Sequence, residues 1–231
     1  LRTGPAFSAE PIVDFDGKDI TGKDTPTLNV QIPASNSDHL VGVSERSESS
    51  PEIKPINDAY EYPVKPGTAE WKAITDPEEL LKACQIPNSI LREISTESLI
   101  ETVLNYPFYD EMFFAYDSLQ KGFNAVATRF NGIQELLNRT DAGGVLLARY
   151  QTMDPMGFNH GASNTEIGTF MFTIYRVEIL LAQNAIRASL TEAQRQDLQK
   201  ALLAKYGIRN HAVEYKGGLY QKIMVLNGIP Q

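Results

Sequence analysis

Cysteine, positive charge and long apolar runs are all scarce in this chain of 231 residues. Its single cysteine, Cys84, excludes an intrachain disulfide framework. No apolar run approaches the roughly 18 residues that a transmembrane helix needs, so we expect no transmembrane segment. Only 21 lysines and arginines accompany 29 acidic residues, and the net charge of −8 argues against a nucleic-acid partner. The hydrophobic fraction of 42% is nevertheless sufficient for a buried core.

Aromatic residues are scarce in the first 68 positions, which hold 4 of the 21 in the chain. The same stretch holds 8 of the 13 prolines, and up to Glu70 the chain carries 12 acidic and 6 basic residues. Segments such as 44–51 offer too little apolar surface to offset the entropy lost on ordering. The sequence therefore predicts an acidic, Pro/Ser-rich arm over 1–68, loosely ordered or strapped on the body, and a helical domain over 69–231.

From Trp71 onward, apolar residues recur at helical spacing, and the strongest example spans 111–138. Steps of 3 and 4 residues alternate through Tyr116, Leu119, Phe123, Val126, Phe130, Ile133 and Leu137. This spacing predicts one long helix that is packed along its length and mostly buried on that side. Gly122 and Gly132 lie within it and indicate a close approach of another helix, with a bend as the alternative.

Helix-start signals divide the rest of the body. Capping residues or capping boxes are expected at Thr75–Glu78, Ser95 or Thr96, Ser163 and Thr191–Gln194. A long helix is expected over 165–188, and Gly207 is expected to end the helix that begins after Thr191. The pattern predicts an all-α fold: an irregular multi-helix bundle of about six to eight helices with an extended, mostly non-regular N-terminal arm.

The most suggestive ligand motif lies in the arm. Gly17–Asp24 resembles a phosphate-binding P-loop except at its last position, where a Ser or Thr is needed to bind magnesium. Asp24 places negative charge there instead. Asp14, Asp16 and Asp19 suggest calcium, but they lack the glycine and glutamate positions of an EF-hand. A surface turn with solvated acids is favoured, with weak calcium binding as the alternative, and we expect no cofactor.

Histidine and cysteine chemistry is equally sparse. The three histidines, His39, His160 and His211, are far apart, so a zinc site would need separate segments to converge. Cys84 lies on the apolar side of a predicted helix, which favours a core residue over a nucleophile. Ser163, near His160, is better explained as a helix cap. The sequence therefore points to no catalytic residue and no metal ligand.

Carboxylates and aromatic side chains provide the remaining candidates. Glu97 and Glu101 share one face of a predicted helix, and Asp110, Glu111 and Asp117 cluster near the start of the expected long helix. A dense aromatic group is a candidate binding surface: Tyr106, Phe108, Tyr109, Phe113, Phe114 and Tyr116. Packing in the core is the simpler interpretation. A groove for a peptide or glycan is the functional one, and acids across an aromatic cleft would suit glycoside hydrolysis.

Several segments of the body carry a resemblance. Ser95–Pro107, Phe123, Arg129–Gly132 and Glu135–Arg139 followed by Asp141–Gly143 are similar to motifs of a family of uncharacterised secreted helical proteins of Gram-positive bacteria. The resemblance covers residues 66–205 and leaves out the acidic arm. It implies a helical fold and a secreted or cell-surface location, and it implies no activity and no catalytic residue. Because the chain begins with leucine rather than methionine, we expect it to be processed or truncated.

Two functions remain open at this point. The first is a non-enzymatic interaction or scaffold module that binds a protein, peptide or glycan partner. The second is a hydrolase that acts on cell-wall or peptide material. A continuous exposed aromatic groove would favour the first, whereas a deep pocket with converging acids or His160 would favour the second.

Overall fold

The computed structural model describes residues 56–215 and 218–229, which belong to the unit Ser50–Gln231. Every regular element in these ranges is a helix, so the all-α prediction is confirmed. The elements are α1 Ala69–Ala73, α2 Pro77–Ala83, α3 Asn88–Glu93, α4 Thr96–Leu104, α5 Glu111–Phe114, α6 Leu119–Arg129, α7 Asn131–Asn138, α8 Ala142–Thr152, α9 Asn164–Leu181, α10 Asn184–Ala188, α11 Glu192–Asn210, the 3₁₀ helix η1 Val213–Tyr215 and α12 Gly218–Leu226.

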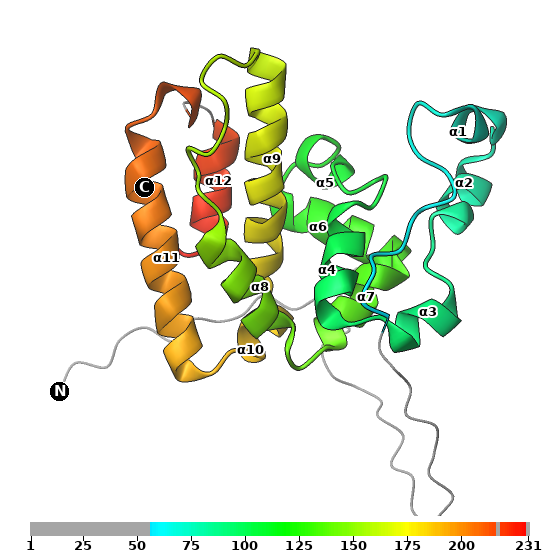
Figure 1. The fold of residues 1–231 in the computed structure, drawn as a ribbon, viewed down its shortest axis with the longest axis horizontal. Coiled ribbons are helices and arrows are strands. Elements are labelled where there is room, and N and C mark those ends of the chain that lie inside the picture. The colour runs from blue at the N-terminus through cyan, green and yellow to red at the C-terminus, as the bar shows by residue number, and fades with distance from the viewer. Residues whose placement is uncertain (1–55, 216–217, 230–231) are drawn as a thin grey trace, which may run out of the picture. The chain divides into compact units, whose positions relative to one another are not determined.

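The helices pack in two neighbouring groups (Figure 1). In one group α8 packs against α9 and α11, and α12 packs against α9. In the other, α6 packs against α5 and α7. Helix α4 contacts α7, α8 and α9 and therefore joins the groups, so that one apolar core runs through both. No helix in the described ranges is long and apolar enough to cross a membrane.

Most helix starts follow the capping signals in the sequence. The Ser95 hydroxyl accepts a hydrogen bond from the backbone N–H of Ser98 at the start of α4. Ser163 forms a complete capping box at the start of α9, and Thr191 forms another at the start of α11. These three predictions are confirmed because each depends on residues within one helical turn.

Two of the predicted helix boundaries are wrong. Asp76, not Thr75, occupies the N-cap of α2 and accepts from the N–H of Glu78, because the proline that follows it takes the first helical position. Helix α11 continues through Gly207 to Asn210. Its last turn carries Arg209, which is buried against neighbouring helices, and this tertiary anchoring outweighs the low helix propensity of glycine.

The single long helix predicted over 111–138 is wrong, because the segment forms α5, α6 and α7. The main break is at Phe130, whose backbone is extended with φ −123° and ψ 114°. The extended geometry directs the Phe130 ring into the core, where it stacks on Tyr106 with centroids 3.8 Å apart. The seven apolar residues spaced at steps of 3 and 4 are nevertheless largely buried, except that Leu137 is half-buried and Tyr116 is 37% exposed.

The two glycines of this segment are places of close approach. A Cβ added to Gly122 would lie 2.8 Å from Cα of Met112, so the side chain is absent where α5 and α6 meet. A Cβ added to Gly132 would lie 2.8 Å from Cδ1 of Ile86 and closer still to the Phe130 ring. Glycine at 132 therefore makes room for the ring that the break brings inward.

The helix predicted over 165–188 is also divided. Helix α9 ends at Leu181, and Gln183 adopts an extended backbone before α10 begins. The Gln183 amide donates to the carbonyl of Ile179 at 2.7 Å and accepts from Gln120 at 3.0 Å. A buried side-chain amide thus supplies local hydrogen bonds at the break.

The chain before α1 packs on the body over its described part. Ile56 exchanges backbone hydrogen bonds with Glu93 and Ser95, at 2.8 and 2.9 Å. Farther along, the Tyr62 hydroxyl donates to the Thr102 carbonyl at 3.0 Å, and the Tyr62 ring is buried. Residues 56–64 are therefore a strap that covers α4, whereas residues 1–55 of the predicted arm lie outside the described residues.

Candidate binding surface on α4, α8 and α11

The six aromatic side chains proposed as a binding surface are divided between core and surface. Tyr106, Tyr109 and Phe113 are buried, and Phe108 is half-buried. Phe114 is 73% exposed, the highest fraction among the large hydrophobic side chains of the described ranges, and Tyr116 is 37% exposed. The structure therefore places most of this group in the core, and only the last two can meet a partner directly.

The residues considered for nucleophilic or metal chemistry lie apart. Cys84 is fully buried, and desolvation raises the pKa of its thiol to about 11, so a thiolate is disfavoured at neutral pH. The Ser163 hydroxyl donates to Glu166 at 2.7 Å within its capping box. His160 is exposed, and its ring contacts Phe158. Within the described ranges no three His, Cys, Asp or Glu residues converge on a metal position.

Several candidates from the sequence belong to residues 1–55. The P-loop-like segment Gly17–Asp24, the acids Asp14, Asp16 and Asp19, and His39 all lie outside the described residues. The predictions made for them stay predictions.

Two of the acids singled out in the sequence, Asp110 and Glu111, join helices through arginines. Asp110 accepts two hydrogen bonds from Arg176, at 2.8 and 2.6 Å, and Glu111 accepts one from Arg129 at 2.6 Å. Bidentate pairing of this kind fixes the orientation of both side chains. These carboxylates hold α5 against α9 and α6, so their evident role is structural.

A fully buried ion pair lies between α9 and α11. Both side chains, Glu178 and Arg209, have no exposed surface, and Arg209 donates to the two carboxylate oxygens at 2.5 and 3.2 Å. The Tyr150 hydroxyl donates to the same carboxylate at 2.6 Å. The Arg209 guanidinium also lies 4.5 Å from the ring centre of Tyr220. Burial alone would lower the pKa of Arg209, but the facing carboxylate raises it overall, so the arginine stays charged.

This cluster is closed to ligands. Tyr150 keeps its proton because burial and the Glu178 carboxylate raise its pKa. The backbone carbonyl of Glu178 accepts from the side chain of Asn227, the residue after α12, which ties the end of a fourth helix to the pair. Because the charged groups are hydrogen-bonded to each other, the cluster holds α8, α9, α11 and α12 together and has no opening to substrate.

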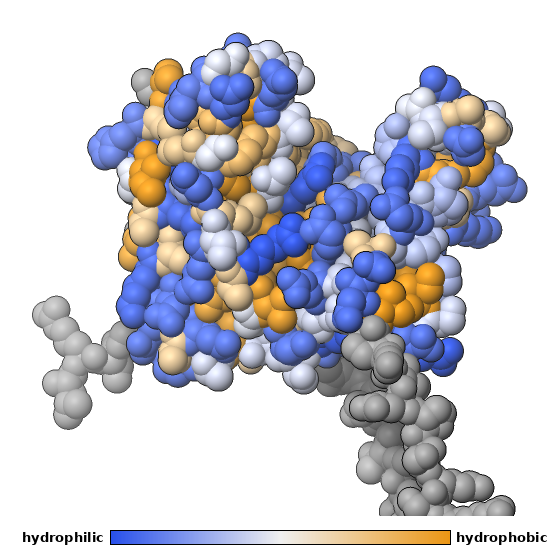
Figure 2. Space-filling view, viewed as in Figure 1, coloured by the Kyte–Doolittle hydropathy of each residue, from blue (hydrophilic) through white to orange (hydrophobic). Residues whose placement is uncertain are grey.

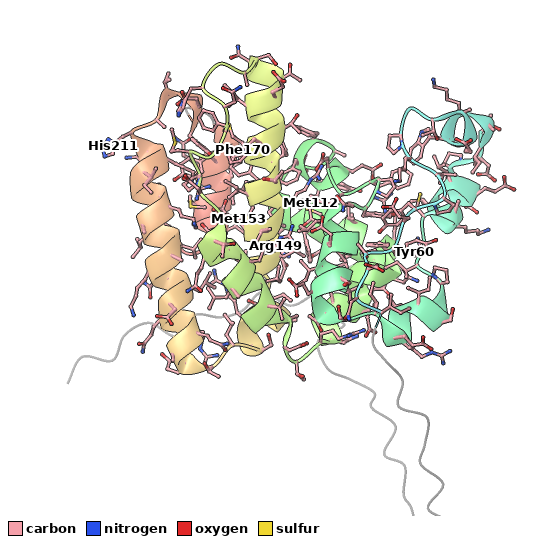
Figure 3. The ribbon with its side chains drawn as sticks, in the orientation of Figure 1. Tyr60, Met112, Arg149, Met153, Phe170 and His211 are labelled. Carbon is pink, nitrogen blue, oxygen red and sulfur yellow. The ribbon has the colours of Figure 1, made fainter. Side chains whose placement is uncertain are left out.

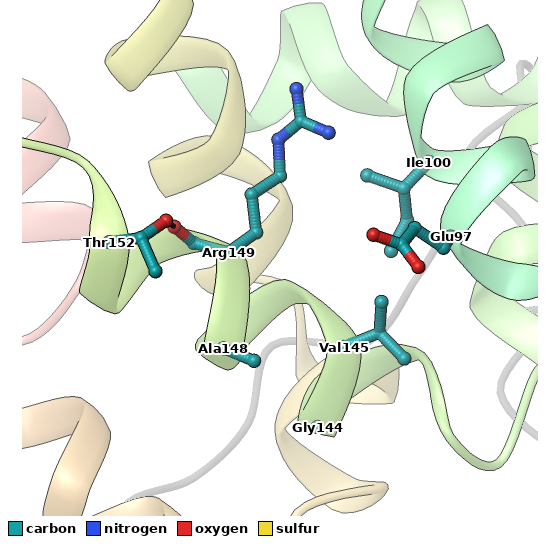
Figure 4. A pocket seen from close by; sticks show the side chains of 7 residues that line it. All are labelled: Glu97, Ile100, Gly144, Val145, Ala148, Arg149 and Thr152. Atoms are coloured by element: carbon teal, nitrogen blue, oxygen red, sulfur yellow. Dashed lines mark hydrogen bonds between the residues drawn. The ribbon is translucent and has the colours of Figure 1, made fainter.

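An open hollow lies on the surface where α4 and α8 meet (Figure 4). It encloses about 540 Å³ and is lined by Glu97, Ile100, Gly144, Val145, Ala148, Arg149 and Thr152. Ile100, Val145 and Ala148 give it an apolar floor. Glu97 reaches from α4, and Arg149 reaches from α8 and pairs with Glu101 at 2.6 Å. The hollow thus combines apolar area with a charged rim.

A second, smaller hollow adjoins the C-terminal end of α8. It encloses about 340 Å³ and is lined by Gln151, Thr152, Met153, Asp154, Pro155, Ala201, Ala204, Lys205 and Ile208. Thr152 lines both hollows. Arg149, which lines the larger one, lies in the last turn of α8, and Met153, which lines the smaller one, follows the helix directly (Figure 3). Figure 2 shows hydrophilic and hydrophobic residues interleaved over this face of the molecule.

Lys205 is the unusual residue of the smaller hollow. It is 8% exposed, its ammonium donates to the carbonyl of Met153, and Nζ lies 5.1 Å from the ring centre of Tyr150. Burial and the positive charge of Arg209 lower the pKa of Lys205, and the Glu178 and Asp154 carboxylates oppose this shift in part. A buried cation that lines a surface hollow makes this hollow a candidate binding site.

Sequence reasoning missed Lys205 and Arg149, although the sequence contained a signal for the first. Leu198, Leu202, Lys205 and Arg209 share one face of α11 at spacings of 4, 3 and 4 residues. Two cations on an apolar face require either buried acids or a ligand, because lysine and arginine are almost never fully buried without a partner. The spacing along α11 would therefore have identified Lys205 and Arg209 as buried cations, but it gives no signal for Arg149 of α8.

Comparison with family models, curated proteins and solved structures finds no match to this chain. The resemblance to a family of secreted helical proteins therefore stays a prediction, and the function is argued from the geometry above.

Proposed function

We propose that this protein is a secreted bacterial interaction module without catalytic activity, and that it binds a peptide segment of a protein partner in the hollow between α4 and α8. The observation that carries the proposal is the lining of that hollow, with an apolar floor of Ile100, Val145 and Ala148 beside the charged side chains of Glu97 and Arg149. Such a lining can accept apolar side chains and orient a peptide backbone by polar contacts at the rim.

A peptide suits this hollow better than a glycan. Sugar rings are commonly bound by stacking on exposed aromatic side chains, and none of the residues that line the hollow is aromatic. Its volume of about 540 Å³ lies within the range of small-ligand sites and would hold a few side chains of an extended or helical segment.

A binding role is also favoured over hydrolysis. The nucleophile candidates Cys84 and Ser163 are respectively buried and engaged in a helix cap, and neither lines the hollow. His160 lies in a loop against Phe158. The secreted, bacterial character of the proposal rests on the resemblance described for residues 66–205.

Selection of peptides from a random library against the full chain tests this proposal. Enriched peptides are expected to bind the unaltered protein and to lose at least about tenfold in affinity on Ala148→Arg, which fills the floor of the hollow. The matched control is Lys72→Glu, which changes an exposed residue of α1 outside the hollow and is expected to leave the affinity unchanged. Equal loss in both variants, or no enriched peptide, would contradict the proposed site.

Catalysis is tested separately on the same preparation. Incubation with labelled peptides and labelled cell-wall fragments is expected to release no more product than a blank. Turnover that depends on the folded protein would contradict the non-enzymatic part of the proposal.

A further inference from the structure

Lys205 differs from Arg209, the other buried cation among the described residues, in the charge that surrounds it. Arg209, one turn farther along α11, faces the Glu178 carboxylate at 2.5 Å. Among the described residues no carboxylate forms an ion pair with Lys205, whose ammonium has the Met153 carbonyl and the Tyr150 ring as its neighbours. A carbonyl and a ring face offer partial negative charge only. The ammonium therefore has no carboxylate in contact, and the Glu178 and Asp154 carboxylates act on it only at longer range.

The ammonium also has donor capacity to spare. It carries three N–H groups, of which one donates to Met153, and the approach to Tyr150 uses the ring face. Because the side chain lines the smaller hollow, a ligand placed there can reach it. A negatively charged oxygen would satisfy the remaining donor and neutralise the charge together.

The rest of the lining restricts what can carry that oxygen. Met153, Pro155, Ala201, Ala204 and Ile208 are apolar, and the volume of about 340 Å³ lies at the low end of ligand sites. A small apolar group therefore fits beside the ammonium.

The charges around the hollow select against highly charged anions. Asp154 lines the same hollow, and α8 ends there, so its last carbonyl groups contribute partial negative charge. A phosphate dianion would be repelled by both, whereas a single carboxylate can turn its charge toward Lys205. The hollow is thus suited to a monoanion.

We propose that the hollow between the end of α8 and α11 binds a monocarboxylate with a short apolar group, and that its carboxylate pairs with the ammonium of Lys205. The chemistry is shared by a short-chain fatty acid and by the C-terminal carboxylate of an apolar peptide. The inference goes beyond the peptide site on α4 and α8, and it does not depend on that site being occupied.

Isothermal titration of the full chain tests the proposal with matched acids and amides. Hexanoate and glycyl-alanyl-leucine represent the two sources, and their amides remove the charge and keep the shape. At least one acid is expected to bind with a Kd of about 1 mM or tighter, and its amide at least about tenfold more weakly. Binding of hexanoate alone assigns the fatty acid, and tighter binding of the tripeptide assigns the peptide terminus. Equal binding of acid and amide, or no heat from either acid at about 10 mM, overturns the proposal.

Variants locate the binding on Lys205. Lys205→Met keeps the length of the side chain and is expected to abolish binding of the acid, whereas Lys200→Met, at an exposed residue paired with Asp197, is expected to leave it unchanged. Ile208→Glu is a second variant for the case in which Lys205→Met does not fold, because Ile208 is 48% exposed and the new charge repels the carboxylate. Unchanged binding in whichever folded variant is measured overturns the proposal. Ala148→Arg distinguishes this site from the peptide site, since it is expected to spare carboxylate binding.

Discussion

Removal of one charge from the buried ion pair of α9 and α11 tests how this fold is held together. Glu178→Gln keeps the size of the side chain and removes the negative charge that faces Arg209. The guanidinium would then be left with one amide oxygen and with uncharged neighbours: the carbonyl of Lys205, the rings of Tyr215 and Tyr220, and the sulfur of Met224. None of these carries a full negative charge, and Arg209 has no path to solvent in the described structure.

The size of the effect follows from this burial. Breaking a buried ion pair by removing one partner costs about 3–5 kcal/mol, because the remaining charge stays desolvated. The hydrogen bond from Tyr150 can be kept by the amide oxygen, and the contact with Tyr220 persists, so we expect about 3–4 kcal/mol. For domains of this size, about 1 kcal/mol lowers Tm by about 2–4 °C, which gives a fall of about 6–16 °C.

Urea unfolding followed by far-UV circular dichroism, together with a thermal scan, measures the loss. The matched control is Asp197→Asn on the same helix, which breaks the exposed pair with Lys200 and is expected to cost about 0–1 kcal/mol. The double change Glu178→Met with Arg209→Met removes both charges and is expected to be more stable than Glu178→Gln alone. A loss below about 1 kcal/mol for Glu178→Gln would refute the assignment of this pair as a desolvated, structural one.

Further predictions concern single contacts. Gly122→Ala should lower the unfolding free energy by about 1–3 kcal/mol in urea, because its Cβ meets the backbone of Met112, whereas Gly168→Ala, with open space, should raise it by about 0.5–1 kcal/mol. Cys84, with its pKa raised to about 11, should resist iodoacetamide at pH 8 until urea unfolds the chain, as mass spectrometry would detect, and rapid labelling of folded protein would contradict its burial. Tyr62→Phe should cost about 1 kcal/mol in the same urea assay, with no loss if the strap does not use this hydroxyl.

Local signals in the sequence predicted the helix starts well and the helix lengths poorly. The capping boxes at Ser163 and Thr191 were predictable because both partners lie within one turn. The break at Phe130 was not predictable, because apolar residues recur at steps of 3 and 4 through both α6 and α7, on either side of it. What bends the chain there is the stacking of Phe130 on Tyr106, a contact between segments that spacing within one helix cannot reveal.

The candidate surface was harder to predict than the fold. The aromatic cluster near α5 was visible as composition, but only the packing of α5 against α6 and α9 shows that Tyr109 and Phe113 are internal and that Phe114 is not. The hollow between α4 and α8 depends on residues about fifty positions apart, such as Glu97 and Arg149. Such a site arises from the pairing of two helices, which no local pattern encodes.

The two cations of α11 show where sequence reasoning reaches its limit. Lys205 and Arg209 are four residues apart on the same buried face, so helical periodicity assigns them the same environment. The fold separates them, because Glu178 of α9 lies opposite Arg209, whereas the end of α8 presents a carbonyl and an open hollow to Lys205. The packing of α8 and α9 decides which of the two cations has a carboxylate in contact, so helical periodicity alone cannot distinguish them.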